Sequence, residues 1–212
     1  HPSFGMAIIS RLLESYGYTV GIIAQPNINK STDFTKLGTP KLGFLVSSGN
    51  IDSMVNHYSV SKKRRSKDQY SPNGEMGLRP DYATIKYSSK IRELFPTSAI
   101  IIGGIEASLR RLAHFDYWSN KVRKSILIDA KADLLVYGMS ELSIIEVADY
   151  LRSGLDIKDI CFIKGTVFKT KNDDYIPEDI IELPSYDDIT SNKKTYAKSF
   201  NIKYENIDHI SA

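Results

Sequence analysis

The sequence contains a single cysteine, Cys161, and this scarcity excludes several classes of site at once. One thiol cannot form a disulfide within the chain, and it cannot build a zinc or iron–sulfur centre from several cysteines of this chain. A chain without disulfides is typical of a reducing compartment, so we expect a cytoplasmic protein. Because Cys161 follows an isoleucine within a short apolar run, we expect the thiol to pack as a small hydrophobic group.

Long apolar runs and strong charge are also missing. No stretch approaches the roughly 18 apolar residues of a transmembrane helix, and the first residues lack the pattern of a signal peptide. The formal net charge is only +3, which does not indicate nucleic-acid binding. We therefore expect neither a membrane nor a nucleic acid as partner. The chain starts without methionine and runs directly into a helical pattern, which indicates a piece of a longer protein.

The usual motifs of phosphate binding and catalysis are absent as well. There is no G-x-G-x-x-G, no Walker-type glycine loop and no nucleophile elbow. The four histidines are scattered and form no H-x-x-x-H or H-E-x-x-H pair. These absences predict no metal site, and no residue of this chain is assigned as a catalytic acid, base or nucleophile.

What the sequence does contain is an alternation of helical and strand patterns. Apolar residues recur at helical spacing over about 3–16, 81–95, 105–114 and 140–154, and short buried-strand patterns fall at 20–24, 42–46, 99–102 and 132–137. Right-handed crossovers then give an α/β fold, a Rossmann-like, doubly wound and mostly parallel sheet. Such domains normally begin with a strand, so the first strand is either absent or lies upstream of His1.

The C-terminal part departs from this alternation. Residues 160–163 and 166–169 predict a small hairpin around Lys164-Gly165. Residues 1–182 are then expected to form the Rossmann-like domain, and 183–212 a polar extension. Within the domain, residues 51–79 have little periodic pattern, which in a compact fold is typical of a functional or mobile segment.

Polar side chains and glycines follow the predicted strands, and the densest group lies in the stretch Ala99–Trp118. The carboxyl ends of parallel strands meet at one edge of the sheet, where ligands bind in open α/β folds. We therefore expect a substrate-contacting or interface edge there. Its candidate residues are Asn50, Asp52, His57, Gly103, Gly104, Glu106, Arg110, Arg111, His114, Asp116 and Trp118.

Each of these residues also has a purely structural interpretation. Gly103-Gly104 suits either close packing or the approach of a ligand. In a helix, Glu106 and Arg110 would form an i,i+4 ion pair that pins the loop, or else the guanidinium would be held ready for a phosphate or carboxylate. We expect His57 and His114 to hold loops by hydrogen bonds rather than to perform acid–base chemistry.

Four segments carry a resemblance that extends over about residues 1–205. They read HPSFGMAIISRLLESYGYTVGIIAQP, SSGNIDSMVNHY, GGIEASLRRLAHFDYWSNKVRKSILIDAKADLLVYGMSE and LPSYDD. Together they resemble the YgiQ-like radical S-adenosylmethionine (radical SAM) proteins, a family of unassigned reaction.

The resemblance implies an N-terminal domain like the cobalamin-binding-type Rossmann domains. The catalytic barrel would follow later, with a C-x3-C-x2-C motif that binds a [4Fe–4S] cluster and S-adenosylmethionine. This chain has only Cys161, so by itself it would hold neither cofactor and be inactive. Its partners would be its own C-terminal radical SAM barrel and an unknown substrate. Cobalamin stays open, because residues 1–5 follow the D-x-H-x-x-G loop of cobalamin domains only loosely.

Three functions remain open at this point. The domain is an accessory unit that positions substrate or packs on the barrel, a pure interaction module, or an RNA-binding module that uses the basic segment 62–67. A pocket that holds Glu106, Arg110 and His114 together would favour ligand binding. The same side chains spread over a flat face would favour packing.

Overall fold

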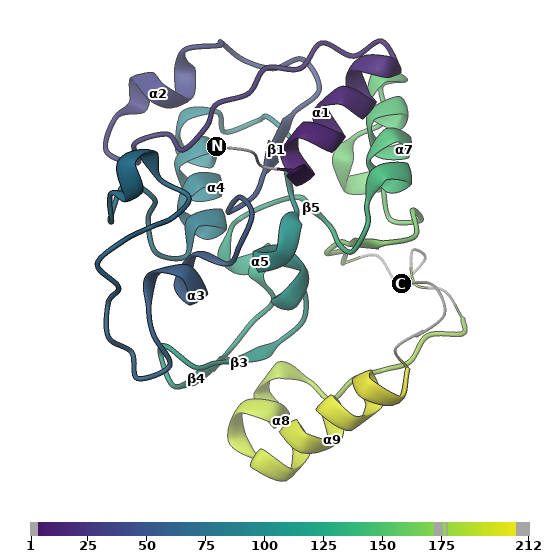
Figure 1. Cartoon of the computed structure of the whole chain (residues 1–212). Coiled ribbons are helices and arrows are strands. Elements are labelled where there is room, and N and C mark those ends of the chain that lie inside the picture. Colours follow the sequence, from purple (N-terminus) through teal and green to yellow (C-terminus); the bar gives the residue numbers. More distant parts are fainter. Residues whose placement is uncertain (1–3, 172–175, 177, 207–212) are drawn as a thin grey trace.

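The computed structural model describes residues 4–171, 176 and 178–206. Its centre is a four-stranded sheet in the order β1-β2-β5-β6. Strands β1 (Phe44–Val46), β2 (Ile100–Ile102) and β5 (Leu134–Val136) run parallel, and β6 (Thr166–Val167) pairs antiparallel with β5. The α/β class and the mostly parallel sheet are thereby confirmed (Figure 1).

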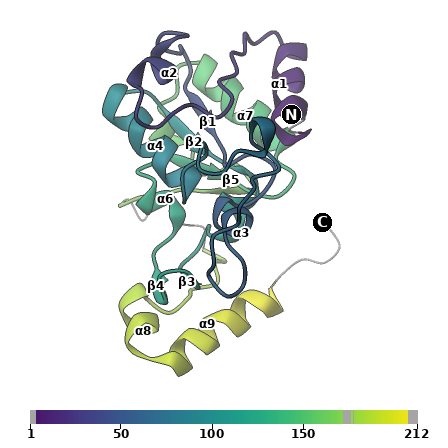
Figure 2. The same ribbon diagram turned by 60° about the vertical axis from the view of Figure 1, so that its left-hand side comes forward.

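Helices cover both faces of this sheet. On one face lie α2 (Ser31–Thr35), α4 (Ala83–Leu94) and α6 (Ile126–Asp129), and on the other lie α1 (Phe4–Ser15) and α7 (Glu141–Arg152). Figure 2 shows α1 and α4 on opposite sides of β1. Alternate residues of a strand point to opposite faces. Ile100 and Ile102 accordingly pack toward α4, whereas Ile101 packs toward α7.

The remaining elements are short and lie around the sheet. They are α3 (Ser53–His57), α5 (Gly104–Leu109), the hairpin β3 (His114–Asp116) and β4 (Lys121–Arg123), two 3-10 turns at 72–74 and 157–159, and α8 (Tyr186–Ser191) with α9 (Lys193–Glu205). Helices α8 and α9 lie beside the hairpin in both views (Figures 1 and 2), where Phe115 N donates to the Tyr196 hydroxyl at 3.0 Å. No helix in these described ranges is both long and apolar enough to cross a bilayer.

Three sequence predictions about elements are wrong. Residues 20–24 form no strand, because no described strand lies beside them to pair with their backbone. The hairpin at 160–169 does not form, since β6 pairs with β5 and Ile160 and Ile163 are buried among the α7-face residues. The helix predicted to reach residue 114 ends at Leu109, because the Arg110 carbonyl turns away to accept a hydrogen bond from Ile126 N at 2.9 Å.

Candidate functional site

The glycine pair at the end of β2 is a close-packing device. A Cβ atom at Gly103 would lie 3.1 Å from a Val136 methyl group, and one at Gly104 would lie 3.2 Å from the Ser47 Cβ. Gly104 also has a φ of +78°, in the left-handed region that side chains disfavour. The pair therefore lets the ends of β1, β2 and β5 approach one another.

Glu106 lies at the centre of a buried network. Its side chain is almost fully buried, and Oε2 accepts hydrogen bonds from Ser53 N (2.8 Å) and Ser53 Oγ (2.6 Å). Oε1 accepts from Thr84 N (2.9 Å), and Ser53 Oγ accepts in turn from Ala83 N (3.0 Å). One carboxylate thus accepts hydrogen bonds from backbone N–H groups in the first turns of both α3 and α4. A negative charge is favourable at these helix N-termini.

Arg110 pairs with Asp52 and not with the Glu106 side chain. Asp52 caps α3 by accepting hydrogen bonds from Met54 N and Val55 N, and its other oxygen forms the ion pair with Arg110. The predicted Glu106–Arg110 pair is wrong because α5 ends before Arg110, so the two side chains do not share a helix face. Arg110 does form a structural ion pair, as one of the two interpretations expected, but its partner is Asp52.

A second network pins the segment 51–79. His57 Nδ1 lies 2.7 Å from Asp81 Oδ1, so the expectation that His57 holds a loop is confirmed. Fully buried Asp68 accepts hydrogen bonds from Asn56 Nδ2 (2.8 Å), Tyr70 N (2.9 Å) and Ser71 Oγ (2.9 Å). Burial alone would raise the pKa of Asp68, but these hydrogen bonds outweigh it and lower the pKa. Outside α3 and the 3-10 turn at 72–74, the segment has little regular structure and is held by buried polar contacts.

Asp116 organises the β3–β4 turn. Its carboxylate accepts hydrogen bonds from the Tyr82 hydroxyl (2.8 Å) and from the Ser119 backbone N–H (3.1 Å) and side-chain hydroxyl. Burial would raise the pKa of Asp116, yet the hydrogen bonds from Ser119 and Tyr82 lower it. Burial and the same contact with Asp116 raise the pKa of Tyr82 to about 12.

These depressed pKa values predict a loss of stability in acid. A carboxylate whose pKa is lowered on folding stabilises the folded state fully above its ordinary pKa of 3.8, and this contribution disappears as the pH falls through the lowered value. We expect the free energy of unfolding to fall as the pH drops below about 4. Asp116→Asn should flatten that fall in denaturant titrations made at several pH values. Asp187→Asn, at an exposed position, is the control and should leave the slope unchanged.

The other candidate residues do not converge on one site. Arg111 lies over the Tyr137 ring at 4.9 Å, and its Nη1 donates to the Ser108 carbonyl at 2.8 Å. His114 Nδ1 lies 3.2 Å from the Leu112 carbonyl, and burial lowers its pKa. Asn50 is exposed in the loop after β1. Glu106, Arg110 and His114 line neither of the two hollows described below, and Glu106 has no access to solvent.

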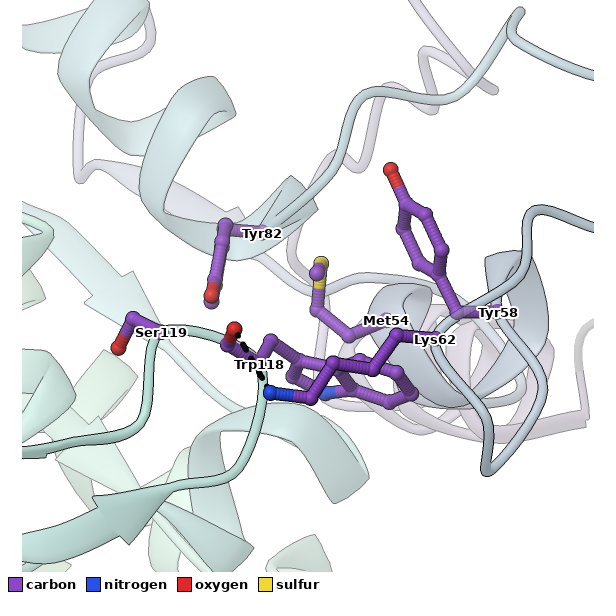
Figure 3. A pocket seen from close by; sticks show the side chains of 6 residues that line it. All are labelled: Met54, Tyr58, Lys62, Tyr82, Trp118 and Ser119. Carbon is purple, nitrogen blue, oxygen red and sulfur yellow. Dashed lines mark hydrogen bonds between the residues drawn. The ribbon is translucent and has the colours of Figure 1, made fainter.

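Two shallow hollows lie next to the β3–β4 hairpin. Figure 3 shows the first, of about 340 Å³, in which Trp118 is the only lining residue that belongs to the predicted set; the lining residues are Met54, Tyr58, Lys62, Tyr82, Trp118 and Ser119. Lys62 Nζ donates to the Trp118 carbonyl at 3.4 Å across it. The second, of about 490 Å³, is lined by Ser119, Lys121, Val122, Arg123, Lys124, Asp129 and Tyr186. Sequence reasoning missed both, because they depend on how distant loops meet.

Apolar side chains occupy the outer surface of the carboxyl edge, which sequence reasoning also missed. Four of them are between 45% and 78% exposed and follow the ends of β2 and β5, and we call them the carboxyl-edge patch: Ile105, Leu109, Met139 and Leu142. The two segments touch, since Gly138 N donates to Ser108 Oγ at 3.4 Å. The signal was present in the sequence, because apolar residues interrupt the polar strand-end segments.

The described part of the chain offers no obvious metal site. No group of three or more His, Cys, Asp and Glu side chains in it is placed to hold a metal ion. Cys161 is buried and donates to the Lys158 carbonyl at 3.2 Å, and burial raises the pKa of its thiol. The lone thiol therefore does not fit an iron–sulfur cluster. Residues 1–3, which enter the loose likeness to the cobalamin loop, lie outside the described residues, so cobalamin stays a prediction.

Comparison with known proteins identifies the family. The family model described as "Radical SAM N-terminal" matches residues 1–212. A "UPF0313 protein" of Clostridium perfringens (strain SM101 / Type A) is 61% identical over 99% of this chain, and one of Clostridium botulinum (strain Okra / Type B1) is 58% identical over 99%. The chain spans 32% of the length of each of these relatives, and no solved structure matches it. The chain belongs to the Radical SAM N-terminal family, as the resemblance in its sequence predicted.

Proposed function

We propose that this domain is a non-catalytic accessory unit that docks onto the radical SAM barrel of its own full-length protein through the carboxyl-edge patch. It then forms one wall of the substrate site at the barrel mouth. The observation that carries the proposal is the distribution of polar and apolar side chains at this edge, which is the opposite of the usual one. The polar side chains Glu106, Asp52 and Arg110 are turned inward and satisfied, while large apolar side chains face outward.

The exposed side chains of the patch support docking. Exposed apolar side chains that gather on a monomer surface mark an interaction site. Their burial against a partner is favourable, because it removes apolar surface from water. Met139 and Leu142 are the most exposed members, at 78% and 77%.

The rest of the full-length protein is the occupant that we propose. About two thirds of the length of the relatives lies outside the matched region. The cysteines of a [4Fe–4S] cluster must lie there too, because this chain has only Cys161. When bound in that barrel, the cluster would supply the electron that cleaves S-adenosylmethionine. In this arrangement residues 1–182 are the docking domain, and residues 183–212 lead toward the barrel.

The basic segment 62–67 favours no second function. Its cationic residues are exposed, as expected for a solvated loop. Lys62 lies 4.6 Å from the centre of the Tyr117 ring, and Arg64 lies 5.9 Å from that of Tyr58, so part of the charge is engaged within the chain. RNA binding would require an affinity that falls steeply with salt concentration.

Hydroxyl-radical footprinting of the full-length protein tests the docking. Met139 is more exposed than Met76 in the structure of this domain, so an undocked domain would have Met139 oxidised faster. We expect the reverse in the full-length protein, with Met139 oxidised several-fold more slowly than Met76. A faster oxidation of Met139 would contradict the proposed docking surface.

Enzymatic measurement tests the role in catalysis. We expect the full-length protein, prepared anaerobically with a reconstituted cluster, to form 5′-deoxyadenosine from S-adenosylmethionine. Met139→Asp/Leu142→Asp should lower the rate of 5′-deoxyadenosine formation by about tenfold or more, since a buried charge at an interface costs several kcal/mol. Val60→Asp, which changes an apolar side chain that is 84% exposed elsewhere, is the matched control. A full-length protein that never forms 5′-deoxyadenosine would rule out the enzymatic role.

A further inference from the structure

The two hollows beside the β3–β4 hairpin adjoin each other. Ser119, in the turn of the hairpin, lines both of them. Asp116 holds this residue in place, because its carboxylate accepts hydrogen bonds from the Ser119 backbone N–H (3.1 Å) and hydroxyl group. Asp116 is itself buried and also accepts from the hydroxyl of Tyr82, the residue that precedes α4. A ligand that spans both hollows would therefore meet a wall that is already in place.

The first hollow is aromatic. The ring centres of Tyr58 and Trp118 lie 5.4 Å apart, and the ring planes meet at an angle of 43°. Figure 3 shows these rings and that of Tyr82 around the side chain of Met54, which is buried. Aromatic faces and a thioether attract flat, polarisable rings, and proteins often bind a nucleobase by stacking it on an aromatic side chain. Lys62 is the single charged residue among the six that line this hollow.

The second hollow is cationic. Three of its lining residues are basic, namely Lys121, Arg123 and Lys124, and Asp129 is the one carboxylate in the lining. Arg123 and Asp129 pair with each other at 2.8 Å. Lys124 lies 5.2 Å from the centre of the Tyr186 ring, and no described carboxylate pairs with either lysine. Because its cations outnumber its carboxylate, this hollow suits an anion such as a phosphate.

The cations are few, and this favours a small ligand over a nucleic acid strand. A protein that binds a strand tightly makes about six to ten phosphate contacts. Here only two lysines of the second hollow are unpaired, and the acidic Asp187 and Asp188 follow Tyr186 in the first turn of α8 without lining the hollow. The hollow volumes, about 340 and 490 Å³, lie in the range of about 300–1,000 Å³ that is usual for small-molecule sites.

We propose that the two hollows together form a binding site for a nucleotide, with its heterocyclic base in the aromatic hollow and its phosphate in the cationic one. The base stacks on Trp118, and the phosphate accepts hydrogen bonds from Lys121 and Lys124. The observation that carries the proposal is an aromatic lining and a cationic lining that meet at one shared residue, Ser119. The proposal does not rest on docking, because no residue of the carboxyl-edge patch lines either hollow.

Calorimetric titration of the full-length protein tests this site. The probes are the common ribonucleoside 5′-monophosphates, the corresponding nucleosides, inorganic phosphate and a short single-stranded RNA. We expect at least one monophosphate to bind about tenfold or more tightly than its nucleoside and than inorganic phosphate, because the monophosphate fills both hollows. The proposal is overturned if no monophosphate binds at millimolar concentration, or if only the RNA binds and its affinity falls steeply with salt concentration.

Variants of the aromatic hollow locate the base. Trp118→Ala should weaken the binding of the monophosphate by about tenfold or more, as expected for the loss of one stacked aromatic ring. Trp118→Phe keeps an aromatic face and should weaken binding much less. Tyr16→Ala, which removes an exposed aromatic ring at the end of α1, is the control and should have no effect. An unchanged affinity of Trp118→Ala would place the base elsewhere and contradict the proposal.

Variants of the cationic hollow locate the phosphate, and they decide the matter if Trp118→Ala fails to fold. Lys121→Glu/Lys124→Glu changes two exposed side chains, so the core stays intact. It should weaken the binding of the monophosphate by about tenfold or more and leave that of the nucleoside unchanged. Lys36→Glu, exposed at the end of α2, should change neither. Equal affinities of the two charge variants for the monophosphate would overturn the proposal. Oxidation of Met139 reports docking separately, so either proposal can fail alone.

Discussion

Replacing Glu106 by alanine is expected to lower the free energy of unfolding of residues 1–212 by about 3–5 kcal/mol, the largest effect of any single substitution considered. The substitution removes the carboxylate that accepts from Ser53 N, Ser53 Oγ and Thr84 N. A buried donor that loses its acceptor costs about 1–3 kcal/mol, because it gave up water to fold. Two helices, α3 and α4, would lose the group that satisfies their first turns.

Denaturant titration with matched variants tests this role. Glu106→Gln keeps the volume and one acceptor oxygen, so its cost should be intermediate, about 1–3 kcal/mol. Glu146→Ala, on the exposed surface of α7, should change the free energy of unfolding by less than about 0.5 kcal/mol. If Glu106→Ala and Glu146→Ala have the same midpoint, Glu106 is not the structural centre of the edge.

The Asp52–Arg110 pair should produce an effect of nearly the same size. Arg110→Met keeps the apolar stem but leaves the buried Asp52 without its counter-charge. Breaking one side of a buried ion pair costs about 3–5 kcal/mol, since the remaining charge has lost both water and its partner. Asp52→Asn should cost less than Asp52→Ala, because the asparagine oxygen still caps α3 through Met54 N and Val55 N.

A double-mutant cycle separates the pair from its surroundings. The Asp52→Asn/Arg110→Met double variant should be more stable than the sum of its single variants implies, with a coupling of about 1–3 kcal/mol. The exposed Arg11–Glu14 pair on α1 is the comparison, and its cycle should give almost no coupling. Strict additivity at Asp52 and Arg110 would show that the contact contributes little.

Local patterns predicted much of the fold from the sequence. Short apolar runs identified β1, β2 and β5, and helical spacing with end signals identified α1, α4 and α7. These patterns succeed because a strand buried on both faces needs apolar residues at every position, and an amphipathic helix needs them at every third or fourth. The family was also predicted correctly, from the amino-acid sequences of the four segments quoted in the sequence analysis.

Long-range pairing could not be predicted in the same way. Residues 20–24 have the composition of a buried strand, but a strand exists only where a neighbour supplies hydrogen bonds, and no described strand lies beside them. Residues 166–167 pair with β5, and not with residues 160–163 as the predicted hairpin required. Backbone pairing depends on what lies beside a segment in space, which its own sequence does not specify.

For the candidate site, the sequence by itself predicted that polar segments follow the ends of the parallel strands, because β-strand polarity brings those ends to one edge of the sheet. Only the tertiary structure decided what they do there. Glu106 and Arg110 are four residues apart, yet each found a better partner fifty or more residues away, in Ser53 and Asp52. Buried charges must be satisfied by whatever groups the packed fold places next to them. In this domain that requirement buried the side chains of Glu106 and Asp52, whereas those of Met139 and Leu142 remain exposed at the same edge.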